Sequence, residues 1–477
     1  MRDPLSLLSL AVAAGGGTMD GLPGSALVAA GITLLQRSVP LVRALSGRRA
    51  AIMLPPSPQF LVALAASEGR GAVLVNPLAA PPEIAHQLSD ANVGAVFTIE
   101  ALAGAIPEGL VTVLLDQAPR TARVIQSGTC REVDLGSHFG LDLEGEQGVR
   151  GSDEEAVVVY TSAMAGTPLG AILTHRNLLA NARSTIEAAE MTDADHMLAL
   201  LPLSHLFGLT VTAIAPLLAG GRVSTVARFN PARTLEQLEQ GDITQLVGVP
   251  AIFAALVALL ERRGGKASLP NLRLAICGGA PLDVALQDRW ANATGTELRQ
   301  GYGLSEASPV CLFNRVQAEN RRGSLGVPFP GVQATIRNPD SGHEVPDGVE
   351  GEICVRGENV FPGYVSNGEQ GLGRHGEWLR TGDLGVRGEG GSIAFSGVLK
   401  PMFTRNGFNV YPRELERAML ELRGVKSVRV RPIADAMHEN EILLEVTGSV
   451  SENAVRDWAA KRLSAYKQPS EVRVVPV

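Results

Sequence analysis

The sequence lacks the features that mark several classes of protein. Its four cysteines (Cys130, Cys277, Cys311 and Cys354) have neither the spacing of a zinc site nor that of a disulfide framework. No apolar run approaches the roughly 20 residues of a membrane span. There is no basic cluster, and 42 lysines and arginines against 49 aspartates and glutamates give a net charge of -7. These absences argue against a nucleic-acid partner and a transmembrane segment, and they favour a reduced, cytoplasmic setting.

What is present is the composition of a globular protein with a substantial core. Hydrophobic residues make up 45% and charged residues 19% of the chain. A length of 477 residues predicts more than one domain. The apolar segment 5–14 has the length of a signal-peptide core, but Arg2 is followed at once by Asp3 and Pro4, so the first helix of the domain is the favoured interpretation.

Strand-like and helix-like segments alternate over the first half of the chain, which is typical of parallel α/β layers. Examples are the strands 50–54 and 71–75 around the helix 59–67, and later the strand 245–249 followed by a helix from Pro250. Another strand is expected at 273–277.

From about residue 325 to 397 the pattern changes to short runs rich in valine and glycine, at 331–336, 351–355 and 391–395. Such runs predict antiparallel strands of a small barrel or sheet. The last unit of roughly 80 residues carries a helix at 412–422 and a strand at 425–432.

The segment 160–170 is the most informative part of the chain. The apolar run 157–160 predicts a buried strand, Gly166, Pro168 and Gly170 predict a turn, and Asn177 opens a helical pattern. Strand, glycine-bearing loop and helix is a geometry in which backbone N–H groups converge on an anion. No Gly-Lys-Ser/Thr closes the loop, so it is not a Walker A loop.

The segment resembles the Tyr-Thr-Ser-Gly-Thr-Thr-Gly-x-Pro-Lys-Gly signature of the adenylate-forming superfamily, which includes acyl-CoA synthetases, luciferases and the adenylation domains of peptide synthetases. The resemblance implies that Thr161, Ser162 and Gly166 bind nucleotide. Ala163, Ala165 and Leu169 stand where that signature has glycine, threonine and lysine, and Met164 also replaces a threonine.

The resemblance also implies a fold. The class is α/β, with a large N-terminal AMP-binding domain (1–397) of two α/β subdomains plus a small β-barrel. A small, shortened and mobile α+β domain (398–477) follows. Lys400 would lie at the hinge between the two domains, and Val398 replaces an arginine that reaches the ribose in relatives.

Further segments match the same superfamily. The motif 201–208 resembles the border of the acyl pocket, with His205 facing the substrate carboxylate, although a lone histidine among apolar residues is more often a core residue. By resemblance His205, Phe207, Pro250 and Ile252 would line that pocket. No charged residue in these segments is placed to pair with an amino group, so a fatty or aryl acid is favoured over an amino acid.

The nucleotide is assigned to three further motifs by resemblance. A tight turn with Gly279, Ala280 and Pro281 would stack against adenine, although such a string is otherwise only a turn. The resemblance gives the motif 301–306 the strongest roles: Tyr302 and Gly303 beside adenine, Ser305 on the α-phosphate and Glu306 on Mg²⁺. A carboxylate suits that cation because Mg²⁺ prefers hard oxygen ligands. In the segment 378–385, Asp383 would accept from both ribose hydroxyls.

Two other features bear on activity. Relatives continue past the Tyr-Lys-Gln-Pro at 466–469 into a Pro-x-Thr-x-x-Gly-Lys segment, whereas this sequence ends at Val477, so the resemblance implies loss of a third cationic group besides those at Leu169 and Val398. The spacing of His138 and Asp142 occurs in some acyltransferases, but no other motif supports it, and chance is the better explanation.

Three functions follow from these observations. The favoured one is an acyl-CoA synthetase-like ligase that activates a carboxylic acid with ATP and Mg²⁺ to acyl-AMP, then passes the acyl group to CoA or to the phosphopantetheine thiol of an acyl carrier protein. The second is a family member that binds nucleotide or acyl ligand without adenylation. The third performs only acyl transfer to a thiol.

Overall fold

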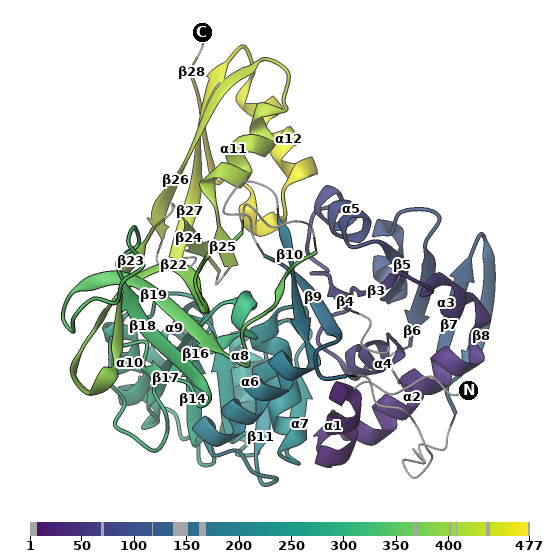
Figure 1. Cartoon of the computed structure of the whole chain (residues 1–477), viewed down its shortest axis with the longest axis horizontal. Coiled ribbons are helices and arrows are strands. Elements are labelled where there is room, and N and C mark those ends of the chain that lie inside the picture. The colour runs from purple at the N-terminus through teal and green to yellow at the C-terminus, as the bar shows by residue number, and fades with distance from the viewer. Residues whose placement is uncertain are drawn as a thin grey trace.

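The computed structural model shows a large α/β body with a smaller unit above it, drawn in yellow in Figure 1. The smaller unit stands over the junction between the purple and blue half of the body and its green half. The structure describes residues 7–67, 71–116, 118–136, 151–161, 168–365, 371–399, 402–406, 408–435 and 439–475.

One half of the body is built on a nine-stranded sheet with a parallel centre. Across the sheet its strands are β20 (Gly363–Tyr364), β10 (Leu169–Thr174), β9 (Glu155–Thr161), β4 (Ala72–Leu74), β3 (Arg49–Ile52), β5 (Val93–Thr98), β6 (Val111–Leu115), β7 (Thr121–Gln126) and β8 (Thr129–Asp134). Its helices are α2 (Gly24–Arg37), α3 (Val39–Ala44), α4 (Pro58–Ala66) and α5 (Pro81–Asp90). β4, β5 and α4 are buried throughout, and β3 is buried except for Arg49, as apolar runs between helical segments predict.

The segment around the glycine-bearing loop corrects the predicted order of elements. The loop joins β9 to an antiparallel partner, β10, and helix α6 (His175–Ala189) begins only after that second strand. Thr174 and Asn177 start the helix as a reciprocal capping box, which explains the helical signal at Asn177. The loop is therefore a hairpin connection, and the helix N-terminus does not lie at it.

The other half of the body carries a second nine-stranded sheet with a parallel core. Its strands, in order, are β17 (Val327–Pro328), β16 (Val310–Phe313), β15 (Leu298–Gly303), β14 (Leu274–Cys277), β13 (Gln245–Gly248), β11 (His196–Ala199), β12 (Arg222–Thr225), β1 (Thr18–Met19) and β2 (Leu22–Pro23). Its helices are the π-helix η2 (Phe207–Ile214), α7 (Ala215–Leu218), α8 (Pro231–Glu239), α9 (Pro250–Arg262) and α10 (Val284–Thr294). Helix α1 (Leu7–Gly15) contacts α2, α6 and α7, with Leu8 and Val12 buried.

A small antiparallel sheet and the C-terminal unit complete the chain. The small sheet consists of β18 (Val332–Arg337), β19 (Glu350–Gly357), β21 (Arg374–His375), β22 (Trp378–Arg387) and β23 (Ile393–Val398). The C-terminal unit contains β24 (Phe403–Arg405), β25 (Phe408–Val410), α11 (Pro412–Leu420), β26 (Val425–Asp435), β27 (Glu439–Gly448), α12 (Glu452–Arg462) and β28 (Glu471–Val475). Leu415, Val446 and Val455 belong to a core of this unit that is separate from the core of the body.

The predicted α/β class is confirmed, with a large N-terminal part and a smaller C-terminal sheet domain. The boundary between residues 397 and 398 remains a prediction. Within the described ranges, every helix is too short or too polar to span a bilayer.

Candidate functional site

A cavity of about 260 Å³ lies where the two sheets of the body meet the C-terminal unit. The strand ends of β9, β10, β14 and β15 reach it from the body, and β22 reaches it from the small sheet. Ligands of α/β folds bind at such junctions because strand ends deliver side chains from separate segments to one place. The predicted site residues that line the cavity are Thr161, His205, Phe207, Gly279, Tyr302, Gly303, Ser305, Glu306 and Asp383.

The other predicted site residues divide into two groups. Ala280 and Pro281 follow Gly279 along the chain, and Pro250 and Ile252 lie at the start of α9; these four are not among the described residues that line the cavity. Ser162, Gly166 and Lys400 lie outside the described residues, as do Ala163, Met164, Ala165, His138 and Asp142.

Glu306 is the central carboxylate of the cavity. It lies in a single 3₁₀ turn, η3 (Ser305–Ala307), directly after β15, and its side chain is 6% exposed. The hydroxyl of Tyr364 donates to Glu306 Oε1 over 2.9 Å. Burial raises the pKa of Glu306, whereas hydrogen bonds from Tyr364 and Thr161 lower it. The turn thus holds one carboxylate at a fixed place inside the cavity.

A second carboxylate, Asp383, lies on β22 and is joined to β15. The hydroxyl of Tyr302 donates to Asp383 Oδ2 over 2.6 Å. Burial raises the pKa of Asp383 to about 6. Val398 pairs with Asp383 across the β22–β23 ladder, so the residue in place of the family's arginine lies beside this carboxylate.

The backbone around these carboxylates is packed too closely for larger residues. A Cβ atom added to Gly303 would lie 1.9 Å from the carbonyl oxygen of Pro309. A Cβ atom added to Gly278 would lie 3.1 Å from both the Gly301 carbonyl oxygen and Cζ of Phe207. Glycine at these positions therefore lets three segments of backbone meet at the cavity wall.

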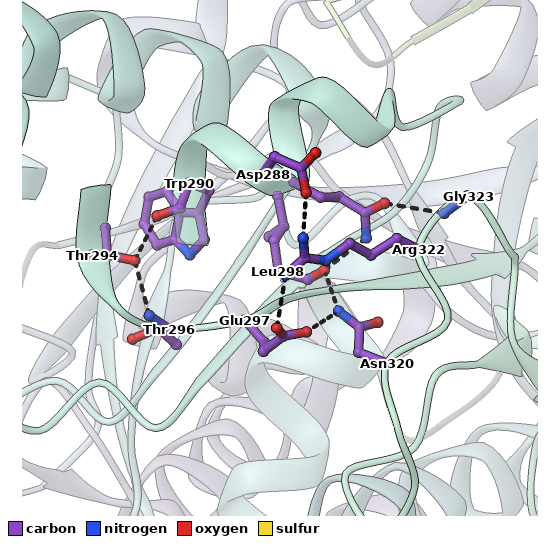
Figure 2. A network of polar contacts seen from close by, with 10 residues as sticks. Asp288, Trp290, Thr294, Thr296, Glu297, Leu298, Asn320, Arg322 and Gly323 are labelled. Atoms are coloured by element: carbon purple, nitrogen blue, oxygen red, sulfur yellow. Dashed lines mark hydrogen bonds and ion pairs between the residues drawn. The ribbon is translucent and has the colours of Figure 1, made fainter. Parts of the chain in front are cut away.

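A polar network surrounds the start of β15, as Figure 2 shows. Arg322 bridges Asp288 and Glu297, with 2.9 Å between Nη2 and Glu297 Oε1. Asn320 Nδ2 donates to Glu297 Oε2 over 2.6 Å and to the Leu298 carbonyl over 3.1 Å. The hydrogen bond from Asn320, followed by the contacts of Arg322, lowers the pKa of Glu297. The network anchors the strand whose other end carries the motif 301–303.

His205 lies on the cavity wall two residues before the π-helix η2 begins. Its Nδ1 accepts a hydrogen bond from the backbone N–H of Phe207 over 3.2 Å, so that nitrogen carries no proton and the ring proton lies on Nε2. The ring is accessible from the cavity but surrounded by protein, and this desolvation lowers its pKa. His205 is therefore a neutral side chain of the cavity wall whose Nε2–H is free to act as a hydrogen-bond donor.

Part of the cavity lining is apolar, and we call this part the apolar recess. Phe207, Val211 and Phe313 line it together with Ile276, Val310 and Phe329. Leu169, at the start of β10, places a further apolar side chain on the cavity wall. The arrangement combines an apolar recess with two carboxylates and a neutral histidine.

Sequence reasoning missed several residues of the cavity wall. Tyr364, Glu83, Tyr411, Ser464 and Lys467 line it, and the last three come from the C-terminal unit. Lys467 belongs to the Tyr-Lys-Gln-Pro segment, which was matched without a role. Glu83 has no motif of its own in the sequence.

The donor set fits a cation bound mainly by a phosphorylated ligand. Among the described residues, no three histidine, cysteine, aspartate or glutamate side chains gather as a metal-binding group. Mg²⁺ bound with nucleotide phosphates takes only one or two protein carboxylates, because phosphate oxygens and water fill its other positions. Glu306 can supply such a single ligand.

Comparison with known proteins agrees with this geometry. A sequence model of the AMP-binding enzyme family matches residues 43–365. The chain is 32% identical over 435 residues to a feruloyl-CoA synthase from Amycolatopsis sp, covering 89% of the chain and 84% of the relative. It is 28% identical over 459 residues to a long-chain-fatty-acid–CoA ligase from Bacillus subtilis, covering 89% and 81%.

A solved structure extends the similarity to the C-terminal unit. A malonyl-CoA ligase in a ternary product complex with methylmalonyl-CoA and AMP matches with a TM-score of 0.79 and 27% identity, over 96% of this chain and 95% of that one. The predicted resemblance to the superfamily is confirmed, and the relatives are enzymes of the predicted ligase class. The chain belongs to the AMP-binding enzyme family.

Proposed function

We propose that this protein is an ATP-dependent acid–thiol ligase. In the first step a carboxylate oxygen of the acid attacks the α-phosphorus of ATP, and pyrophosphate leaves with the electron pair of the broken P–O bond. In the second step a thiol sulfur attacks the acyl carbon, AMP leaves, and the thiol proton passes to solvent. The family membership and the acyl-CoA ligase relatives support this reaction.

The observation that carries the proposal is the convergence of separate segments on one cavity. Thr161, His205, Glu306 and Asp383 come from different strand ends and loops, yet they line the same 260 Å³ space beside an apolar recess. A reaction between an apolar acid and a nucleotide needs both environments side by side.

The proposed roles follow the chemistry of each side chain. Asp383 accepts hydrogen bonds from the ribose diol, and Tyr302 packs on adenine beside it. Glu306 would hold Mg²⁺, and the cation would supply positive charge beside the phosphates. His205, as a neutral donor, orients the acid carboxylate. Orientation of both reactants in a partly dry cavity supplies much of the rate in such sites.

The remaining assignments rest on the motif resemblance. Thr161, Ser162, Ser305 and the glycines Gly166, Gly279 and Gly303 would contact the nucleotide, with Ala280 and Pro281 in the adenine turn. Pro250 and Ile252 would border the acyl recess with Phe207. Lys400 would be the hinge between a domain of residues 1–397 and one of residues 398–477.

We propose a fatty or aryl acid as the substrate, because the recess is apolar and the relatives are fatty-acid and feruloyl ligases. CoA is the proposed thiol, with the phosphopantetheine of an acyl carrier protein as the alternative acceptor. The structure describes all four cysteines as free, which fits a reduced, cytoplasmic setting.

A second candidate, thiol-dependent acyl transfer alone, is favoured by one specific observation. The cavity wall carries Leu169 where the family signature has lysine, and Val398 lies beside Asp383 in place of arginine. Both changes remove positive charge from the step that brings two anions together. Transfer from a preformed acyl-AMP does not need the loop lysine, because no pyrophosphate leaves in that step.

The test measures both half-reactions on the same protein. Pyrophosphate release is followed with Mg-ATP and a panel of fatty and aryl acids, and acyl-AMP and acyl-CoA are read by mass spectrometry with and without CoA. Acid-dependent pyrophosphate is the expected result. If acyl-CoA forms only from supplied acyl-AMP, the protein is the transfer enzyme. If a correctly folded protein gives no product in either assay, both candidate functions are rejected.

A further inference from the structure

The C-terminal unit contacts the body at helix α5, through the side chain of Glu83 and the backbone N–H of Ala80. Glu83 accepts hydrogen bonds from the Ser464 hydroxyl and, over 3.4 Å, from the Ser464 N–H. Ser464 Oγ in turn accepts from the backbone N–H of Ala80 over 3.1 Å, across 384 residues of sequence. Ser464 is buried, so this contact is closed off from bulk solvent.

Lys467 completes the contact. Its ammonium lies 3.1 Å from Glu83 Oε1 and 2.5 Å from Glu414 Oε1, and the residue is 3% exposed. Glu414 belongs to the same C-terminal unit as Lys467, so the Lys467–Glu414 pair is internal to that unit. Glu83 adds a second carboxylate from the body, and it is the member of this group that joins the two parts.

The same face of α5 also holds the flanks of the glycine-bearing loop. Nε2 of His86 lies 3.2 Å from the Pro168 carbonyl oxygen, just after the loop, and the Tyr160 hydroxyl donates to Asp90 Oδ2 over 2.6 Å, just before it. Glu83, His86 and Asp90 are spaced by three and four residues, which places them on one side of a helix. One helix thus contacts both the loop hairpin and the C-terminal unit.

We propose that Glu83 is a positioning residue that sets the C-terminal unit over the cavity for the thiol-transfer step. Ser464, Lys467 and Glu83 all line the cavity, so their contact forms part of its wall. The match to the malonyl-CoA ligase product complex covers 96% of the chain and so includes this unit. The assignment to the transfer step rests on the proposed ligase function.

The contact is suited to this role because it is buried and charged, yet removable. Breaking one member of a buried charged group is costly when it leaves an unpaired charge. Loss of Glu83 leaves Lys467 paired with Glu414, so the C-terminal unit keeps its internal ion pair. Substitution of Glu83 should therefore loosen the arrangement of the two parts without unfolding either of them.

The experiment compares Glu83→Ala with the wild-type protein in two assays. Hydrogen exchange in the full chain, without ligand, is measured over residues 452–468 and over α5. Acyl transfer from synthetic acyl-AMP to CoA, and pyrophosphate release from Mg-ATP and acid, are measured separately. We expect faster exchange at both segments and a loss of transfer within the 5- to 150-fold range of typical coupling between sites, with a clearly smaller change in pyrophosphate release.

Glu100→Ala is the matched control, since Glu100 forms an exposed ion pair with Arg123 in the same half of the body. Unchanged exchange in Glu83→Ala, or equal losses in both half-reactions, would overturn the proposal. Wild-type protein that forms no acyl-CoA from acyl-AMP would reject the ligase function instead, and the exchange data would still show whether Glu83 holds the C-terminal unit.

Discussion

Two walls of the same cavity differ in how closely they follow the family signature. The carboxylate wall, which we define by Tyr302, Glu306 and Asp383, has polar groups that are buried and hydrogen-bonded to one another or to neighbours. The loop wall, which we define by Thr161 and Leu169, has an apolar side chain where the signature has lysine. The contrast separates two proposed tasks of the site: binding of the nucleoside and metal ion, and stabilisation of phosphate charge during adenylation.

The difference has a physical consequence. In the proposed function the carboxylate wall holds a nucleoside and a metal ion, and these interactions would not depend on the loop cation. The loop wall would face the phosphates, where a cation would offset the charge that moves during adenylation. We therefore expect nucleotide binding to be close to that of relatives and adenylation to be slow.

The largest effect is expected at the carboxylate wall. Glu306→Gln keeps the size of the side chain but removes the charge that a hard cation needs. We expect acid-dependent pyrophosphate release to fall about 10²–10³-fold, the usual cost of losing one electrostatic group in a reaction site. Tyr364→Phe, which removes the hydroxyl that donates to Glu306 and accepts from the Leu372 N–H but leaves the carboxylate in place, should cost less. Equal rates for Glu306→Gln and wild type would exclude Glu306 as the metal ligand.

The rigidity of the carboxylate wall is tested by Gly303→Ala. The new methyl group would collide with the Pro309 carbonyl oxygen, so the backbone must shift. We expect a loss of about 1–3 kcal/mol in the free energy of unfolding, as for other overpacked sites, measured by urea denaturation. Gly104→Ala is the control, because nothing lies within 4 Å of the added atom there. A stability loss shared by both variants would show that the site is not specially packed.

The pH dependence of nucleotide binding tests Asp383. Its pKa of about 6 means that the carboxylate, which we propose accepts the ribose hydroxyls, is mostly protonated at pH 5. We expect the affinity for AMP, measured by calorimetry, to be about tenfold weaker at pH 5 than at pH 7.5. Asp383→Asn should bind weakly at both values, and a wild-type profile without this change would contradict the assignment.

The raised pKa of Asp383 also predicts how the stability of the protein depends on pH. The pKa of Asp383 is raised on folding, so between its ordinary value and about 6 the folded state binds more protons than the unfolded state. The contribution of this group to stability therefore falls as pH rises through that window. Asp383→Asn removes the buried charge and should raise the Tm at neutral pH.

The smallest effect is expected at the loop wall. Leu169→Lys restores the cation of the family signature, and we expect pyrophosphate release to rise severalfold, since one lysine in an unadapted wall recovers only part of the lost stabilisation. Leu169→Met, which changes shape without charge, is the control. If neither variant gains activity, the contrast between the two walls does not limit adenylation.

Most of the local structure followed from the sequence. The alternation of apolar strands and helices predicted β3, α4 and β4, and the valine-rich runs predicted β18, β19 and β23. The prediction that a helix directly follows the loop was wrong, because β10 follows the loop and pairs with β9, and α6 starts later. A short apolar segment after a glycine turn gives little periodicity, and pairing with β9 decides that it is a strand.

The candidate site could be proposed from motifs because each motif is a short segment whose residues act together. The motif 301–306 and the segment with Asp383 are of this kind. At the cavity they are joined by the hydrogen bond from the Tyr302 hydroxyl to Asp383. Tyr364 and Glu83 could not be found in this way. Each forms a hydrogen bond with a residue far away in the sequence, and neither belongs to a sequence motif from which that partner could be predicted.

The sequence by itself determined the family, the α/β layers and the identity of the charged and apolar groups available to the site. Only the tertiary structure decided that the loop is a hairpin and that Val398 lies beside Asp383. It also decided that α5 joins the loop flanks to the C-terminal unit through Glu83. Composition and periodicity are local properties of a chain, whereas contacts across hundreds of residues depend on how the sheets and domains pack against each other.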